Sequence, residues 1–218
     1  MWRIDQKRIY FDKDLPNYIV NNMTKERPLR KYFPKINGLL VKLRELSISD
    51  AMNNSQLMTY NISKSLWQVP YPYTIEDAVN FISSSHRDFE SQKAANFAIQ
   101  YKNNPEDVNR LVGTISLKNV NFDKKKATVG YWIGELYWGN GIATESVALV
   151  ITFAFSILRL KEICAYVFSE NKASIRVLEK NGMIKKQELN EFNKMSGRYQ
   201  RTTKYVIQRS FNLDKLWF

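Results

Sequence analysis

The stretch that decides the fold, residues 132–143, reads Trp-Ile-Gly-Glu-Leu-Tyr-Trp-Gly-Asn-Gly-Ile-Ala. A strand-like segment, 128–134, leads into it, and the apolar run 144–158 that follows has the pattern of an amphipathic helix. The turn between them contains Gly139 and Gly141, and glycine lets a backbone approach a ligand closely. Because the free N–H groups of a first helical turn favour anions, this arrangement indicates a site for phosphate.

Length and composition set the class of protein. The 218 residues carry a formal charge of +12, with 44% hydrophobic and 13% aromatic residues. This length suits one substantial domain, or one domain with an appendage. A basic surface favours nucleic acid, anionic membranes or a polyphosphate cofactor, although solubility alone also explains the charge. There is no apolar run of about 18 residues and no signal peptide, so we expect a cytoplasmic protein with no membrane partner.

The chain contains one cysteine, Cys164, and one histidine, His86. A single cysteine forms no internal disulfide, and Cys164 lies in the strand-like run 162–167. We interpret it as a small buried residue rather than a nucleophile. One histidine cannot build a multi-histidine site, and we expect no metal.

Three segments differ in character. Residues 1–38 are rich in Lys, Arg, aromatic residues and proline, which predicts a basic N-terminal arm packed on the domain. Such a mixture also suits RNA, although we favour docking of the arm on its own domain. Residues 39–209 form the predicted main domain, and 210–218 form an amphipathic C-terminal tail.

Apolar periodicity and turn residues predict the elements of the main domain. Thr74 and Asp77 have the spacing of a capping box at the start of one helix. The other helices are expected over about 47–63, 144–158 and 171–180. Strands are expected at 39–44, 96–101, 110–117, 126–134, 162–167, 183–186 and 201–209, with a polar loop at 188–200. The spacing of the first strands indicates an antiparallel meander.

Two common nucleotide motifs are absent from the glycine turn. A dinucleotide-binding turn needs a third glycine where Thr144 stands, and a P-loop needs Lys followed by Ser or Thr where Ile142 and Ala143 stand.

Three blocks instead resemble the GNAT superfamily of N-acetyltransferases, and within it the ribosomal-protein N-terminal acetyltransferases. They are Gly-Tyr-Trp-Ile-Gly at 130–134, Tyr-Trp-Gly-Asn-Gly-Ile-Ala-Thr-Glu at 137–145 and Asn-Lys-Ala-Ser-Ile-Arg-Val-Leu-Glu-Lys-Asn-Gly-Met at 171–183. The resemblance covers about 39–209. It implies an α+β fold with a central mixed, mostly antiparallel sheet flanked by helices, and two splayed parallel strands that hold acyl-CoA. It also implies direct transfer of an acetyl group from acetyl-CoA to a primary amine.

The resemblance implies a set of cofactor-binding residues. Backbone N–H groups of 138–144 hold the pyrophosphate, the preceding strand pairs with the pantetheine amides, and Asn171 contacts the pantetheine arm. Capping of a helix also explains Asn171. Trp138 replaces the Gln or Arg of the wider family and resembles the usual choice in the ribosomal-protein group. The set is Trp132, Ile133, Trp138, Gly139, Asn140, Gly141, Ile142, Ala143, Thr144, Asn171 and Ser174.

The catalytic groups follow less directly. Many members carry a tyrosine where Leu178 stands, and the resemblance suggests that Ser174 instead lies near the coenzyme A sulfur, where it could donate a proton. A first-turn helix serine is the alternative. A strand N–H near Ile133 could polarise the thioester carbonyl.

Three residues are candidates for the base: Glu76, Glu135 and His86. Glu76 lies in the first turn of a helix, where an acid is stabilised without any catalytic role. His86 stands beside Arg87, as a solvated helix residue would.

The acceptor is a peptide N-terminus or a small amine. A basic protein is a poor match for a polycation unless its cleft is locally acidic, which favours a peptide or a neutral amine. The alternative is a non-catalytic acyl-CoA-binding module or an RNA- or ribosome-associated module. Nucleic acid is not expected as a substrate, and a homodimer stays open.

Overall fold

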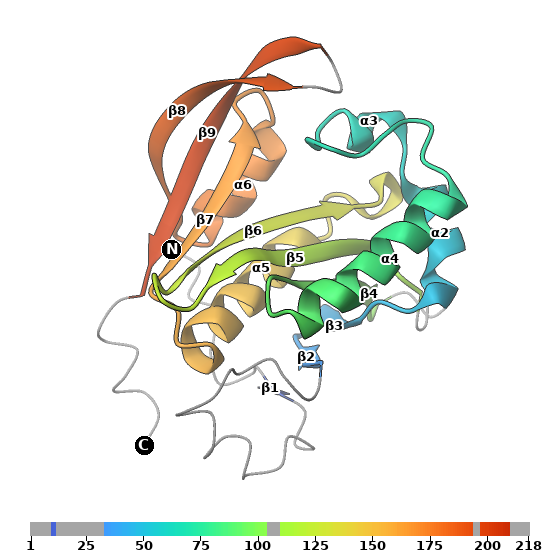
Figure 1. The fold of residues 1–218 in the computed structure, drawn as a ribbon, viewed down its shortest axis with the longest axis horizontal. Coiled ribbons are helices and arrows are strands. Elements are labelled where there is room, and N and C mark those ends of the chain that lie inside the picture. The colour runs from blue at the N-terminus through green and yellow to red at the C-terminus, as the bar shows by residue number, and fades with distance from the viewer. Residues whose placement is uncertain (1–9, 12–32, 104–109, 194–196, 210–218) are drawn as a thin grey trace.

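The computed structural model describes residues 10–11, 33–103, 110–193 and 197–209. Within these ranges nine strands form one sheet in the order β1-β2-β3-β4-β5-β6-β7-β9-β8 (Figure 1). The strands are β1 (Tyr10–Phe11), β2 (Ile36–Asn37), β3 (Val41–Glu45), β4 (Ala95–Tyr101), β5 (Gly113–Asn121), β6 (Lys126–Ile133), β7 (Glu162–Phe168), β8 (Ile184–Asn193) and β9 (Arg198–Gln208). The helices are α2 (Ala51–Leu57), α3 (Tyr60–Ser63), α4 (Ile75–Glu90), α5 (Ile142–Thr152) and α6 (Lys172–Lys180), with short turns η2 (Ile48–Asp50) and η4 (Glu135–Tyr137) and a π-helical turn η5 (Phe153–Ile157).

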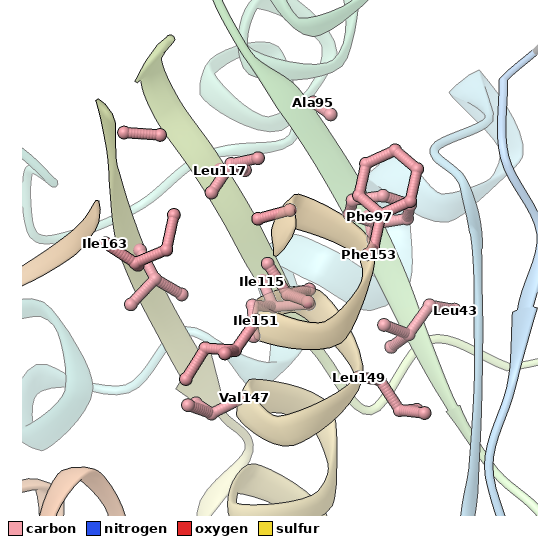
Figure 2. Close-up of a cluster of buried hydrophobic side chains, with 14 of the residues drawn as sticks. Leu43, Ala95, Phe97, Ile115, Leu117, Val147, Leu149, Ile151, Phe153 and Ile163 are labelled. Atoms are coloured by element: carbon pink, nitrogen blue, oxygen red, sulfur yellow. The ribbon is translucent and has the colours of Figure 1, made fainter. Parts of the chain in front are cut away.

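Two hydrophobic clusters lie on opposite faces of the sheet. Successive side chains of β4 alternate between them: Phe97 and Ile99 pack in the cluster of α5, whereas Ala98 packs with Ala78 and Ile82 of α4. Figure 2 shows the α5 cluster, in which that helix lays its apolar side chains against β3 to β7. The sheet is therefore the middle layer between α5 on one face and α2 with α4 on the other.

The strands β1 to β6 pair antiparallel in succession, which confirms the predicted meander. β6 and β7 are parallel, and their register ends early: Lys126 lies opposite Glu162, and Thr128 opposite Cys164. No pair follows, although β6 continues to Ile133. The two strands thus diverge as the resemblance implied, and the sheet is mixed and mostly antiparallel.

Local capping follows the sequence closely. The backbone N–H of Thr74 donates to Asp77 Oδ2 at 2.8 Å, and the Asp77 N–H donates back to Thr74 Oγ1 at 3.1 Å. Gly182 has φ +76° just beyond α6, as a helix C-terminus favours. Cys164 is buried, as expected.

Two of the predicted elements are wrong. The expected loop 188–200 belongs mainly to β8 and β9. Its sequence shows no alternation because β8 is exposed along almost its whole length, and pairing with β9 rather than core burial holds it. The expected helix 47–63 is divided into η2, α2 and α3. The division falls at Thr59, whose side chain accepts from the Ile62 N–H and caps α3.

The predicted helix 144–158 begins earlier, at Ile142, and its last turn is π-helical. Strands β1 and β2 come from the predicted arm and extend the edge of the sheet. The rest of that arm, residues 1–9 and 12–32, and the predicted tail lie outside the described residues.

Candidate active site

The N-terminus of α5 has no side-chain cap. Its N-cap residue is Gly141, which adopts the left-handed conformation with φ +78°. By contrast, Thr74 caps α4 and Asn171 caps α6, each through a side-chain oxygen. The first N–H groups of α5 therefore carry the partial positive charge of the helix without a partner from a capping side chain.

Side chains of the turn itself hold its shape. The Asn140 amide donates to the carbonyl oxygens of Tyr137 at 3.2 Å and Trp138 at 3.3 Å. The Trp138 backbone N–H donates to the carbonyl of Glu135 at 3.1 Å. The backbone N–H of Trp138 therefore already has a partner. The predicted phosphate donors narrow from the N–H groups of 138–144 to those of 139–144.

The Trp138 side chain fixes the turn on β6. Its indole N–H donates to the Ile133 carbonyl oxygen at 2.7 Å. The next residue, Gly134, donates its N–H to Val112 on the β5 side. Since neighbouring residues of a strand direct their backbone groups to opposite edges, the Ile133 N–H points toward the diverging β7 side.

A cavity of about 1110 Å³ opens where β6 and β7 diverge. It runs from the start of α5 past α6 and the ends of β6 and β7 to α3 and the β8–β9 hairpin. Every predicted cofactor residue lines it: Trp132, Ile133, Trp138, Gly139, Asn140, Gly141, Ile142, Ala143, Thr144, Asn171 and Ser174.

Asn171 and Ser174 face this cavity from the start of α6. The Asn171 side chain accepts from the Ser174 N–H at 3.0 Å, so Asn171 is the helix cap. Tyr131 of β6 also lines the cavity and donates its phenol to the Ser174 carbonyl oxygen at 3.3 Å. Burial raises the pKa of Tyr131 to about 12, so this phenol keeps its proton at neutral pH. The Tyr131 phenol thus joins β6 to the first turn of α6 beside the cavity.

The loop after α3 forms the opposite wall. Trp67 of this loop packs against Phe168 at the end of β7, with ring centroids 4.9 Å apart. Tyr60 and Tyr71 pair at 5.5 Å, and both line the cavity while remaining more than half exposed. The contact of Trp67 with Phe168 therefore joins the loop after α3 to the end of β7.

None of the three predicted candidates for the base lines this cavity. Glu76 is exposed at the start of α4. Glu135 accepts from the Thr59 hydroxyl and from Asn61, and so joins η4 to α3. The His86 ring nitrogen Nε2 lies 2.7 Å from the Leu46 carbonyl oxygen.

Among the described residues that line the cavity, Glu170 is the one acid, at the end of β7. The cations of the same lining are Lys64, Arg176, Lys180 and Arg198. Glu170, Tyr131 and Trp67 were not predicted from the sequence. The one sequence signal for Glu170 is its place directly before Asn171, the N-cap of α6. Within the described ranges no three His, Cys, Asp or Glu side chains are grouped so as to hold a metal ion, and none of the helices described there is long and apolar enough to cross a membrane.

Comparison with known proteins identifies the family. The model of one protein family, described as "Acetyltransferase (GNAT) domain", matches residues 41–184 of the chain. The chain belongs to this family. It is an N-acetyltransferase that uses acetyl-CoA as its acetyl donor.

Relatives of this GNAT protein include two proteins of Bacillus subtilis, both named as N-acetyltransferases. YoaA is 31% identical over 62% of this chain and 73% of its own length, and YjcK is 32% identical over 69% and 83%. Among solved structures, Mycobacterium smegmatis RimJ in complex with CoA-disulfide has a TM-score of 0.70 at 20% identity, covering 82% of this chain and 84% of its own. The structural likeness shows the shared GNAT fold.

Proposed function

We propose that acetyl-CoA lies along the cavity between β6 and β7, with its pyrophosphate at the N-terminus of α5. The observation that carries this placement is the uncapped helix N-terminus, which opens into the cavity behind a left-handed glycine. The N–H groups of 139–144 would hold the phosphates. Arg176 and Lys180 line the same space and add positive charge for further phosphate groups.

The chemistry assigned to the cavity is direct transfer. The Ile133 N–H polarises the thioester carbonyl, because it points to the open side of β6. The hydrogen bond from the Trp138 indole to the carbonyl oxygen of the same residue, Ile133, holds this N–H in position. The amine nitrogen forms a bond to the carbonyl carbon, and the carbon–sulfur bond breaks. The Ser174 hydroxyl gives its proton to the leaving thiolate and takes up in exchange the proton that the base removes from the amine, while Tyr131 holds the Ser174 backbone in place.

We assign removal of the amine proton to Glu170. It is the acid among the described residues of the cavity lining, whereas Glu76 and Glu135 do not belong to that lining. The variants Glu170→Gln, Glu135→Gln and Glu76→Gln separate the three. We expect only Glu170→Gln to lower kcat. An unchanged kcat in Glu170→Gln with a loss in either other variant returns the base to the sequence-based candidates.

We propose a peptide N-terminal amine as the acceptor. One relative at 23% identity, from Vibrio cholerae, is named spermidine N(1)-acetyltransferase. A polyamine is best held by several acids, yet this cavity carries one acid against four cations among the described lining residues. The open aromatic mouth at Tyr60 and Tyr71 instead suits an extended chain.

Release of coenzyme A thiol tests the acceptor. Wild-type protein is assayed with a peptide, the same peptide with a blocked N-terminus, and spermidine. We expect turnover with the free N-terminus alone, and preference for spermidine would overturn the acceptor proposal. A cytoplasmic location belongs to the same proposal, since acetyl-CoA is available there.

A further inference from the structure

The carboxylate of Glu145, in the first turn of α5, is bound by three consecutive backbone N–H groups. Leu39 donates to Oε1 at 2.7 Å, and Leu40 and Val41 each donate to Oε2 at 2.8 Å. These donors form the turn from β2 into β3, and they lie more than 100 positions away in the chain. Glu145 does not line the cavity, although its neighbour Thr144 does. The carboxylate thus points away from the proposed phosphate site and into the β2–β3 turn.

The surroundings of this carboxylate leave space for it and little else. A Cβ on Gly38 would lie 2.7 Å from Glu145 Cδ and 2.8 Å from Oε2. On the other side of the contact, a Cβ on Gly141 would lie 3.3 Å from Leu40 Cδ1. The β2–β3 turn therefore contacts both the Glu145 carboxylate and the N-cap of α5, which makes it the support on which the glycine turn rests.

The charge has a consequence for the ligand. An acid in a first helical turn normally competes for the positive helix end, and here it would also repel a phosphate. Three N–H donors satisfy the Glu145 carboxylate instead, so its negative charge is held on the far side of the helix from the cavity.

We infer that Glu145 is a positioning residue for acetyl-CoA: by binding the N–H groups of Leu39, Leu40 and Val41 it holds the α5 N-terminus in the orientation that receives the pyrophosphate. This inference rests on the proposed cofactor site. It assigns Glu145 no contact with the cofactor, and it links a turn near the N-terminal edge of the sheet to cofactor affinity.

The test is the dissociation constant of acetyl-CoA in Glu145→Ala and Glu145→Gln, measured by calorimetry together with kcat. We expect affinity to fall about ten- to a hundredfold, because charge-assisted hydrogen bonds are lost, while kcat at saturating acetyl-CoA changes little. The control is Glu162→Gln, which removes another carboxylate contact, to Lys126 at 2.9 Å, at the far end of β6 and β7. It should lower the melting temperature and leave affinity unchanged. Glu145 variants that melt lower but bind normally would show a structural role only, and would overturn the inference.

A double-mutant cycle gives a second, independent readout. Gly38→Ala should weaken acetyl-CoA binding in the wild type, because its Cβ displaces the Glu145 carboxylate, and should have a smaller effect in Glu145→Ala, where the 2.9 Å approach of that Cβ to Leu149 Cδ1 is what remains. Additive effects would contradict the inference. Gly141→Trp separates this from the parent proposal: if it keeps normal affinity, the cofactor site itself is misplaced, whereas if it loses affinity and Glu145→Ala does not, only the role of Glu145 fails.

Discussion

The indole N–H of Trp138 donates to the carbonyl oxygen of Ile133 at 2.7 Å, across the point where the β6 strand ends and the glycine turn begins. The contact joins the turn that precedes α5 to the strand that borders the cavity. Although Trp138 replaces the Gln or Arg of the wider family, it retains an N–H donor at this position. The Trp138 side chain therefore holds the glycine turn against β6 through this hydrogen bond, and not only through its size.

Replacement of that donor tests this contact. Trp138→Phe keeps an aromatic ring but leaves the Ile133 carbonyl without its partner, so we expect acetyl-CoA affinity to fall about three- to tenfold, the value of one hydrogen bond. Calorimetric titration measures it. Trp67→Phe is the matched control, since it preserves a ring against Phe168 away from the glycine turn. Equal affinity in Trp138→Phe and wild type would contradict a positioning role.

The hydroxyl of Ser174 is the second target. Ser174→Ala should lower kcat roughly a hundredfold, the usual contribution of a positioned acid, with acetyl-CoA affinity retained. Ser174→Thr keeps a hydroxyl and should restore part of the rate. Single-turnover kinetics distinguish the chemical step from product release. If Ser174→Ala turns over at the wild-type rate, the thiolate takes its proton elsewhere, and Tyr131 becomes the candidate because its phenol lies 3.3 Å from the Ser174 carbonyl oxygen.

Replacement of Trp67, in the loop after α3, should affect the acceptor alone. Trp67→Ala removes the contact with Phe168 that joins the loop after α3 to β7. We expect a several-fold higher KM for the acceptor peptide and an unchanged dissociation constant for acetyl-CoA, because the glycine turn is untouched. Steady-state kinetics at saturating acetyl-CoA provide the first value. A larger change in acetyl-CoA affinity than in acceptor KM would show that the loop serves the cofactor instead.

Alkaline titration tests the burial of Tyr131. Its pKa in the folded protein is raised to about 12, above the ordinary value of 10.0, because burial disfavours the phenolate. A raised pKa stabilises the fold below pH 10, and this contribution is lost as the pH rises from 10 toward 12, where the unfolded chain ionises more readily. Absorbance at the phenolate band is compared between wild type and Tyr131→Phe. The phenol missing from the variant should be one that ionises near pH 12, and loss of a phenol that ionises near pH 10 would contradict its burial.

The sequence predicted those parts of the site that depend on residues close together in the chain. The glycine turn, the capping pair of Thr74 and Asp77, and the Asn171 cap were all visible, because each arises from hydrogen bonds over three or four residues. The three GNAT blocks predicted the divergence of β6 and β7. The start of β8 was predicted at 183–186, but its continuation to Asn193 was missed, since an exposed strand leaves no alternating pattern to detect.

By itself, then, the sequence determined a strand, a glycine turn and a helix N-terminus in a GNAT domain. Only the tertiary structure decided what surrounds it: Trp67 against Phe168, Glu170 on the cavity wall, and Glu145 bound to Leu39, 106 positions earlier. The physical reason is the range of the interactions. Local propensity and capping are encoded within one turn, whereas a carboxylate finds distant backbone donors only after the sheet and α5 have packed together.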